Sequence, residues 1–280
     1  MKKLMFVAAL AGAMTGLCDV TSANCVGYTV NGVATDASLQ MYSMMTMPFE
    51  AVDGSGISIN DLKFENPTYN YQKAQADQIL IWLPDQQTYK TYWFYGVKGQ
   101  EKYVTPEWKN WIGDVPFSKD YKDGLPAGTV FWYLSLANAA SMSMTISGAV
   151  PSDPHIDFEI ARGTTVDNYY FIANPYPTAL KLNPADEQVE WGDANYNYQK
   201  AQADQILIWL PDQQTYKTYW FYGVKGQEKY VTPEWKNWVG DVLFSKDYKD
   251  GLPAGTGFWY LSLKGTAAAT QTVRINNPVK

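Results

Sequence analysis

The residues best suited to chemistry in this sequence are tryptophans that stand close to amides and acids. Trp108 and Trp111 lie within residues 104–114, Asp114 follows them, and Trp93 precedes them. Flat aromatic faces bind sugar rings through C–H contacts, while neighbouring amides and carboxylates form hydrogen bonds with sugar hydroxyls. The same set recurs later in the chain as Trp220, Trp235, Trp238 and Asp241. We predict these eight residues as ligand-binding residues, with packing of the indoles into a core as the alternative.

Groups that catalyse reactions are scarce. His155 is the only histidine, which excludes a Ser-His-Asp or Cys-His triad in either copied part and any multi-histidine zinc site. No phosphate-binding glycine loop, nucleophile elbow or paired-cysteine spacing occurs. We therefore predict no catalytic residue, no metal and no cofactor, and we do not expect an enzyme.

Carboxylates leave two alternatives open. Glycoside hydrolysis needs two acids that face each other across a cleft. The acids of the first copy are Asp77, Asp85, Glu101, Glu107, Asp114, Asp120 and Asp123. Most lie in turns beside Lys, Gly or Pro, where solvated loop acids are the ordinary interpretation. Residues 120–124 and 247–251 place oxygen ligands beside a glycine, but their spacing is not that of a known calcium loop, so a charged turn is expected.

An internal repeat organises the chain. Residues 69–136 recur as 196–263, and only three of these 68 positions differ. The differing pairs are Ile112/Val239, Pro116/Leu243 and Val130/Gly257. Continued in both directions without gaps, the offset of 127 aligns Phe64 with Trp191 and Ile146 with Val273 and predicts two units, 26–152 and 153–279. Any surface built by the copied part is present twice.

Short strands are predicted to position these residues. Residues 79–83 form an apolar run that ends in the turn signature Pro-Asp-Gln-Gln, and residues 88–95 complete a hairpin. Further strands are expected at 41–47, 129–136 and 142–147. This pattern predicts an all-β protein with two tandem homologous domains, each a β-sandwich or partly open barrel with its own core. Two separate beads are expected, because no hydrophobic contact region between the units is evident.

Three of these segments resemble a known group of proteins. The segments are Pro-Phe at 48–49, Ile-Leu-Ile-Trp at 79–82, and Leu-Pro-Ala-Gly-Thr-Val-Phe-Trp-Tyr at 125–133. They look like secreted β-domain proteins of unknown function from environmental and gut bacteria, whose signals start Met-Lys-Lys-Leu. The resemblance covers both units. It implies the fold and an exported location, and it implies no site residues.

The first residues predict export. Two lysines precede an apolar run at 4–17, and small residues at 21–23 favour cleavage after Ala23, so 1–23 is predicted to be a signal peptide. A membrane anchor is the alternative, but the run is short for a span. Cys25 then remains as the one cysteine, for which we expect an inert thiol, with lipidation or a bridge between chains as alternatives.

Composition narrows the class of partner. Aromatic residues make up 15% of the chain and charged residues only 18%, which suits a β-rich extracellular protein. A net charge of −6 disfavours nucleic acid and anionic membranes. We expect a non-catalytic secreted or cell-surface interaction or structural protein, whose partner is a glycan or another surface protein, or a further copy of itself. A tandem carbohydrate-binding module is the first alternative, and a glycoside hydrolase is the second.

Overall fold

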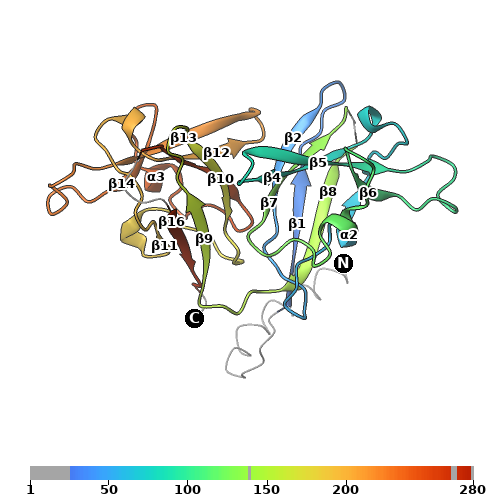
Figure 1. Cartoon of the computed structure of the whole chain (residues 1–280), viewed down its shortest axis with the longest axis horizontal. Helices are drawn as coiled ribbons and strands as arrows, with labels where there is room; N and C mark the ends of the chain where they lie inside the picture. Colours follow the sequence, from blue (N-terminus) through green and yellow to red (C-terminus); the bar gives the residue numbers. More distant parts are fainter. Residues whose placement is uncertain (1–25, 138–139, 266–269, 279–280) are drawn as a thin grey trace, which may run out of the picture.

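A computed structural model describes residues 26–137, 140–265 and 270–278 (Figure 1). These residues form a fold that is nearly all β, with four antiparallel sheets, two of three strands and two of five. The predicted signal peptide 1–23 and the cysteines Cys18 and Cys25 lie outside the described residues. Within those residues, no helix combines the length and apolar character that a membrane span requires.

The first half pairs a three-stranded sheet with a five-stranded sheet. The smaller sheet has the order β1 (Val26–Val33), β8 (Met142–Ala149), β3 (Lys63–Glu65). The larger has the order β2 (Met41–Thr46), β7 (Val130–Ser135), β4 (Gln78–Leu83), β5 (Thr88–Tyr95), β6 (Glu107–Asn110). Short helical turns lie between the strands: η2 (Ile59–Asp61), η3 (Lys73–Gln75) and α2 (Phe117–Asp120).

The second half repeats this arrangement. Its smaller sheet has the order β11 (Val189–Glu190), β16 (Thr270–Asn276), β9 (His155–Ala161). Its larger sheet has the order β10 (Asn168–Ala173), β15 (Gly257–Ser262), β12 (Gln205–Leu210), β13 (Thr215–Tyr222), β14 (Glu234–Asn237). The helical turns are η4 (Pro184–Asp186), η5 (Lys200–Gln202) and α3 (Phe244–Asp247).

Each half has its own hydrophobic core between its two sheets. Strand alternation sends Phe131 and Tyr133 of β7 into the first core, where they meet Ile79 and Ile81 of β4. The second core uses the copied residues of β15 and β12. Because the described strands form two packed sheets in each half and close into no barrel, this part of the chain is a pair of tandem β-sandwiches.

The two halves are not separate beads, contrary to the expectation from sequence. All six residues of β7 are buried, although the first core covers only one face of this strand. The other face carries Trp132, whose ring lies 4.9 Å from that of Trp209 in the second half. The five-stranded sheets thus pack against each other, and Figure 1 shows them meeting at the centre of the molecule.

The ungapped alignment of the repeats is wrong outside the copied part. Asn60 and Asn183 each accept a hydrogen bond from the backbone N–H of the core tryptophan, Trp108 or Trp235, so these two asparagines are equivalent. Three residues separate Asn60 from Phe64, whereas seven separate Asn183 from Trp191. The second half therefore has four additional residues here.

The last strand is also displaced from the ungapped alignment. Thr29 pairs with Ile146, and the equivalent Ile156 pairs with Ile275, so Ile146 corresponds to Ile275 and not to Val273. The connection between the final two strands is two residues longer in the second half. Loops tolerate such length changes because closing a slightly longer loop adds little entropy.

Candidate functional site

Two of the candidate residues, Trp93 and its copy Trp220, lie on the outer face of the five-stranded sheets. Alternation along β5 directs Tyr92 and Phe94 toward the core and leaves Trp93 and Tyr95 on the opposite face. Lys109 of β6 pairs with Trp93 across the strands, and its ammonium lies 3.6 Å from the centroid of the Tyr95 ring. The sheet therefore presents indole, phenol and ammonium groups together.

Lys73, at the start of η3, brings together three of the four predicted residues. Its Nζ lies 2.7 Å from Asp114 Oδ1. The same atom is 5.8 Å from the ring centroids of both Trp93 and Trp111. It also donates a hydrogen bond to the backbone oxygen of Trp111. We call Lys73, Trp93, Trp111 and Asp114 the lysine–indole cluster.

The second half contains the same cluster, built from Lys200, Trp220, Trp238 and Asp241. Lys200 Nζ lies 2.6 Å from Asp241 Oδ1 and donates to the backbone oxygen of Trp238 at 2.6 Å. Both ring centroids are 5.9 Å from this ammonium. All eight residues belong to the copied segments, so the cluster is independent of the diverged first third of each unit.

A tight turn holds the exposed end of the cluster. Gly113 and Asp114 have φ angles of +80° and +55°, in the left-handed region that glycine adopts freely and aspartate tolerates. Asn110 Oδ1 accepts a hydrogen bond of 2.8 Å from the backbone N–H of Ile112. The ion pair from Lys73 then fixes Asp114 beside the Trp111 ring.

Trp108 and Trp235 do not belong to this site. They are 1% and 0% exposed, and each stacks on a phenylalanine, Phe94 or Phe221, with ring centroids 4.8 and 4.7 Å apart. The reason is that residues 107–110 form a strand, whose alternation turns Trp108 inward and Lys109 outward. The prediction that these two indoles contact a ligand is therefore wrong, and the packing alternative holds for them.

Burial also limits the other indoles. Trp93 and Trp220 are 2% exposed beneath the lysine, and among the described residues the Nε1 atom of each has no hydrogen-bond partner. They support the cluster and offer no ring face to a ligand. Trp111 is half-buried and Trp238 is 37% exposed, so only this pair keeps accessible ring surface.

The exposed part of the cluster combines a carboxylate with an aromatic ring. Lys73 Nζ is held between the Asp114 carboxylate, the backbone oxygen of Trp111 and the two indole rings. The side chain of Asp114, in the same cluster as Trp111, is 56% exposed. A ring edge beside a fixed carboxylate can contact a sugar or a polar peptide.

Further exposed side chains flank the cluster along the chain and were not among the predicted residues. Tyr71 lies two positions before Lys73, Ile112 follows Trp111, and Tyr103 lies in the loop between β5 and β6. Their copies are Tyr198, Val239 and Tyr230. The sequence signal for them is an apolar or aromatic residue among Asn, Gln, Lys and Gly, in segments whose composition is typical of exposed turns.

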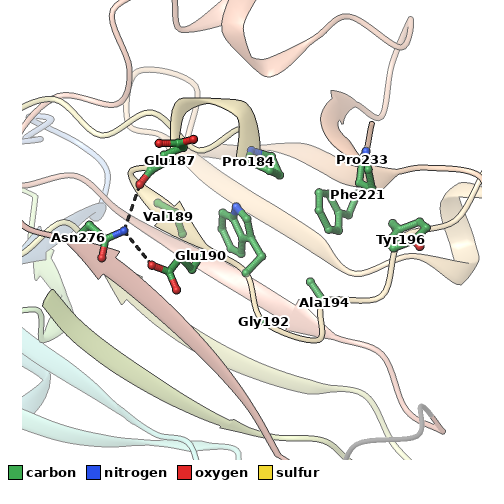
Figure 2. A pocket seen from close by; sticks show the side chains of 11 residues that line it. Pro184, Glu187, Val189, Glu190, Gly192, Ala194, Tyr196, Phe221, Pro233 and Asn276 are labelled. Carbon is green, nitrogen blue, oxygen red and sulfur yellow. Dashed lines mark hydrogen bonds between the residues drawn. The ribbon is translucent and has the colours of Figure 1, made fainter. Parts of the chain in front are cut away.

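A separate pocket of about 550 Å³ occurs in the second half (Figure 2). Trp191 and Phe221 line it, and Asn276 Nδ2 donates at 3.1 Å to both Glu190 Oε1 and the backbone oxygen of Glu187. Pro184 and Glu187, which belong to the segment that is four residues longer in this half, also line the pocket. The pocket therefore depends on the diverged part and was not predicted from the sequence.

The remaining candidate groups have structural partners. Asp120 accepts hydrogen bonds from the Tyr92 hydroxyl at 2.7 Å and from Asn110 Nδ2 at 3.1 Å, and it lies 3.0 Å from Lys90 Nζ. Burial raises the pKa of this carboxyl, but these donors outweigh burial and leave the pKa below its usual value. His155 lies 3.9 Å from Asp157 at the sheet edge. Across the described ranges, no three His, Cys, Asp or Glu residues gather as a metal site.

No family model matches the chain, and no curated protein or solved structure shows significant similarity to it. The functional argument therefore depends on the residues of this molecule.

Proposed function

We propose that the protein is a non-catalytic, exported binding protein that presents the same aromatic surface at two places. The observation that carries this proposal is the matched exposure of copied apolar side chains. Tyr103 and Tyr230 are each 81% exposed, Tyr71 and Tyr198 are each 62% exposed, and Ile112/Val239 follow the same pattern. Side chains of this kind cost solubility when exposed, and their presence in both halves supports a role in recognition.

The arrangement of the halves favours bridging. The loops that follow β5 and β13 carry Tyr103 and Tyr230, and they project at opposite ends of the long axis (Figure 1). Two equal sites that point apart engage two different ligands, or distant points of one polymer, more readily than one small molecule. Weak binding at each site then becomes strong on a multivalent surface through effective concentration.

A glycan is the ligand class that we place first. The accessible ring surface of Trp111 and Trp238 lies beside a fixed carboxylate and a lysine, which suits a sugar face and its hydroxyls. Another surface protein is the second candidate, because exposed tyrosines also serve as interface residues.

The test is a glycan array probed with the mature chain and with a double variant, Trp111→Ala/Trp238→Ala. Val166→Ala, which alters an exposed side chain outside the copied part, is the matched control. Binding that is lost in the double variant and kept in the control supports the glycan. Binding that survives the double variant, or no binding by the original chain, rejects it in favour of a protein partner.

Export has its own test. Expression of the whole chain in a bacterial host should release a protein whose first residue is Asn24, as cleavage after Ala23 requires. Retention of residues 1–23 on the purified protein would contradict the proposed location. It would have no bearing on the binding proposal.

A further inference from the structure

The contacts between the two halves are reciprocal. Trp82 of the first half packs against Trp259 of the second, with ring centroids 5.0 Å apart and planes at 90°. The copies exchange roles, since Trp209 packs against Trp132 at 4.9 Å and 81°. An interface in which each partner offers the same surface, so that residue i meets j and copy j meets copy i, has two-fold symmetry.

Hydrogen bonds follow the same two-fold rule. The Gln87 side chain accepts from the backbone N–H of Tyr169 at 2.8 Å and donates to the backbone oxygen of Tyr169 at 3.1 Å. Gln214 does the same with Tyr42, at 2.9 and 3.0 Å. Each amide thus pairs with an edge strand of the other half, which satisfies backbone groups that an exposed edge would leave open.

Val130 lies against Gly257, which is its own copy in the second half. In a two-fold interface a residue meets its own copy only at the axis, so this position marks the two-fold axis. A Cβ atom placed on Gly257 would lie 2.9 Å from both methyl carbons of Val130. Gly257 belongs to a regular strand and has no positive φ. The glycine is therefore needed because it leaves room for Val130, and not because of its backbone conformation. Valine at both positions would therefore clash.

The other two differences within the copied part do not touch the opposite half. Ile112 and Val239 are 83% and 80% exposed. Pro116 and Leu243 precede the short helices α2 and α3 and pair with Lys109 and Lys236 of their own halves. The one change at the interface is the change that removes a clash.

We propose that the outer face of the five-stranded sheet is a docking surface for a second copy of the same unit. We further propose that Val130 opposite Gly257 decides which copies pair. We call Trp82, Gln87, Val130 and Trp132, with their copies, the docking face. Two first-half faces would oppose two valines, so a first half pairs with a second half, which in this structure belongs to the same chain.

The first experiment exchanges the two residues within the full chain. Gly257→Val alone and Val130→Gly alone should each lower the thermal unfolding midpoint, by about 5 °C, through overpacking and cavity formation respectively. The swap Val130→Gly/Gly257→Val should recover more than half of the larger loss, although Thr46, 3.1 Å from the added Cβ, must shift slightly.

The swap keeps the proposal testable when Gly257→Val alone fails to fold. A folded swap then supports the pairing. A swap that is no more stable than Gly257→Val, or a Gly257→Val variant as stable as the original chain, overturns it.

The second experiment opens the interface with a buried charge and measures mass by light scattering over a range of concentrations. Val130→Arg blocks the first-half face and frees the face with Gly257, which can oppose a second Gly257 without a clash, so this variant should form dimers. Gly257→Arg frees the face with Val130 and should stay monomeric, as should the control Val239→Arg.

Each result decides a part of the proposal. Two monomeric arginine variants would reject docking with a second copy, and two dimeric variants would reject selection by Val130. Loss of all folded structure in both, while Val239→Arg folds, would contradict docking between halves that have separate cores.

Discussion

The two halves contain the same buried acid in different surroundings. Asp77 accepts hydrogen bonds from the Tyr133 hydroxyl at 2.7 Å and from the backbone N–H groups of Thr68 and Leu136 at 2.8 and 2.9 Å. Asp204 accepts the same three bonds in the second half, from Tyr260, Asn195 and Leu263. The copied segment reproduces this local geometry closely.

The diverged segments change the charge around the acid. In the second half, Arg162 Nη2 lies 3.2 Å from Asp204 Oδ2 and donates to Gln271 at 2.6 Å. The equivalent residues of the first half are Thr35 and Met142, which supply no cation. Burial therefore raises the pKa of Asp77, and the three donors only partly offset that effect. Identical local sequence thus does not ensure identical electrostatics.

The largest effect is expected from removal of the buried cation. Arg162→Met leaves the buried Asp204 without its counterion, which should lower the free energy of unfolding by about 3–5 kcal/mol. Urea denaturation measures this loss. Arg274→Met removes a half-exposed partner of Asp157 and should change stability little, so equal losses in the two variants would contradict the role of burial.

The second prediction compares the two acids directly. Asp204→Asn leaves Arg162 without its counterion, whereas Asp77→Asn replaces an acid that has no counterion. Both variants disturb the same three hydrogen bonds, so that loss cancels in the comparison. Asp204→Asn should therefore be less stable than Asp77→Asn by about 2 kcal/mol at neutral pH. Equal denaturation midpoints would show that Arg162 adds nothing to the shared geometry.

The third prediction concerns pH. The folded-state pKa of Asp77 is raised, so the stability that its protonated form contributes is complete below the unfolded pKa of about 3.9 and is lost as pH rises through the folded value. Asp77→Asn should remove this decline. The urea midpoint, plotted against pH from pH 4 to pH 7, should therefore have a different slope in the original chain and in the variant. Parallel slopes would refute the shift.

The sequence predicted the strands well and the site only in part. The hairpin at 79–83 and 88–95 matches β4 and β5, because alternation and turn residues are local signals. Trp108 was misplaced because the spacing from Trp108 to Trp111 suggests one surface, whereas the strand ends at Asn110 and only Trp111 leaves it. Lys73 was missed because it lies 38 residues from Trp111, and only the fold brings the two together.

The sequence contains a signal for the docking face. The run Val-Phe-Trp-Tyr-Leu-Ser of β7 is apolar without alternation, a pattern typical of strands covered on both faces. Such a run predicts a second layer of protein over the strand. The local pattern does not show which part of the protein forms that layer, because the layer is the sheet of the other half and is distant in sequence.

The smallest expected effect comes from a pair of variants that compare the strength of the same contact on the two sides of the interface. Gln87 and Gln214 have φ angles of +48° and +49°, a conformation that glycine adopts without strain. Gln87→Gly should therefore relieve the backbone while it removes the two hydrogen bonds to Tyr169, for a net loss of about 1 kcal/mol. Gln214→Gly should lose the same amount, since its bonds to Tyr42 have matching lengths. Unequal losses in urea denaturation would mean that the diverged edge strands β2 and β10 set the strength of each contact, and that the symmetry of the interface is geometric but not energetic.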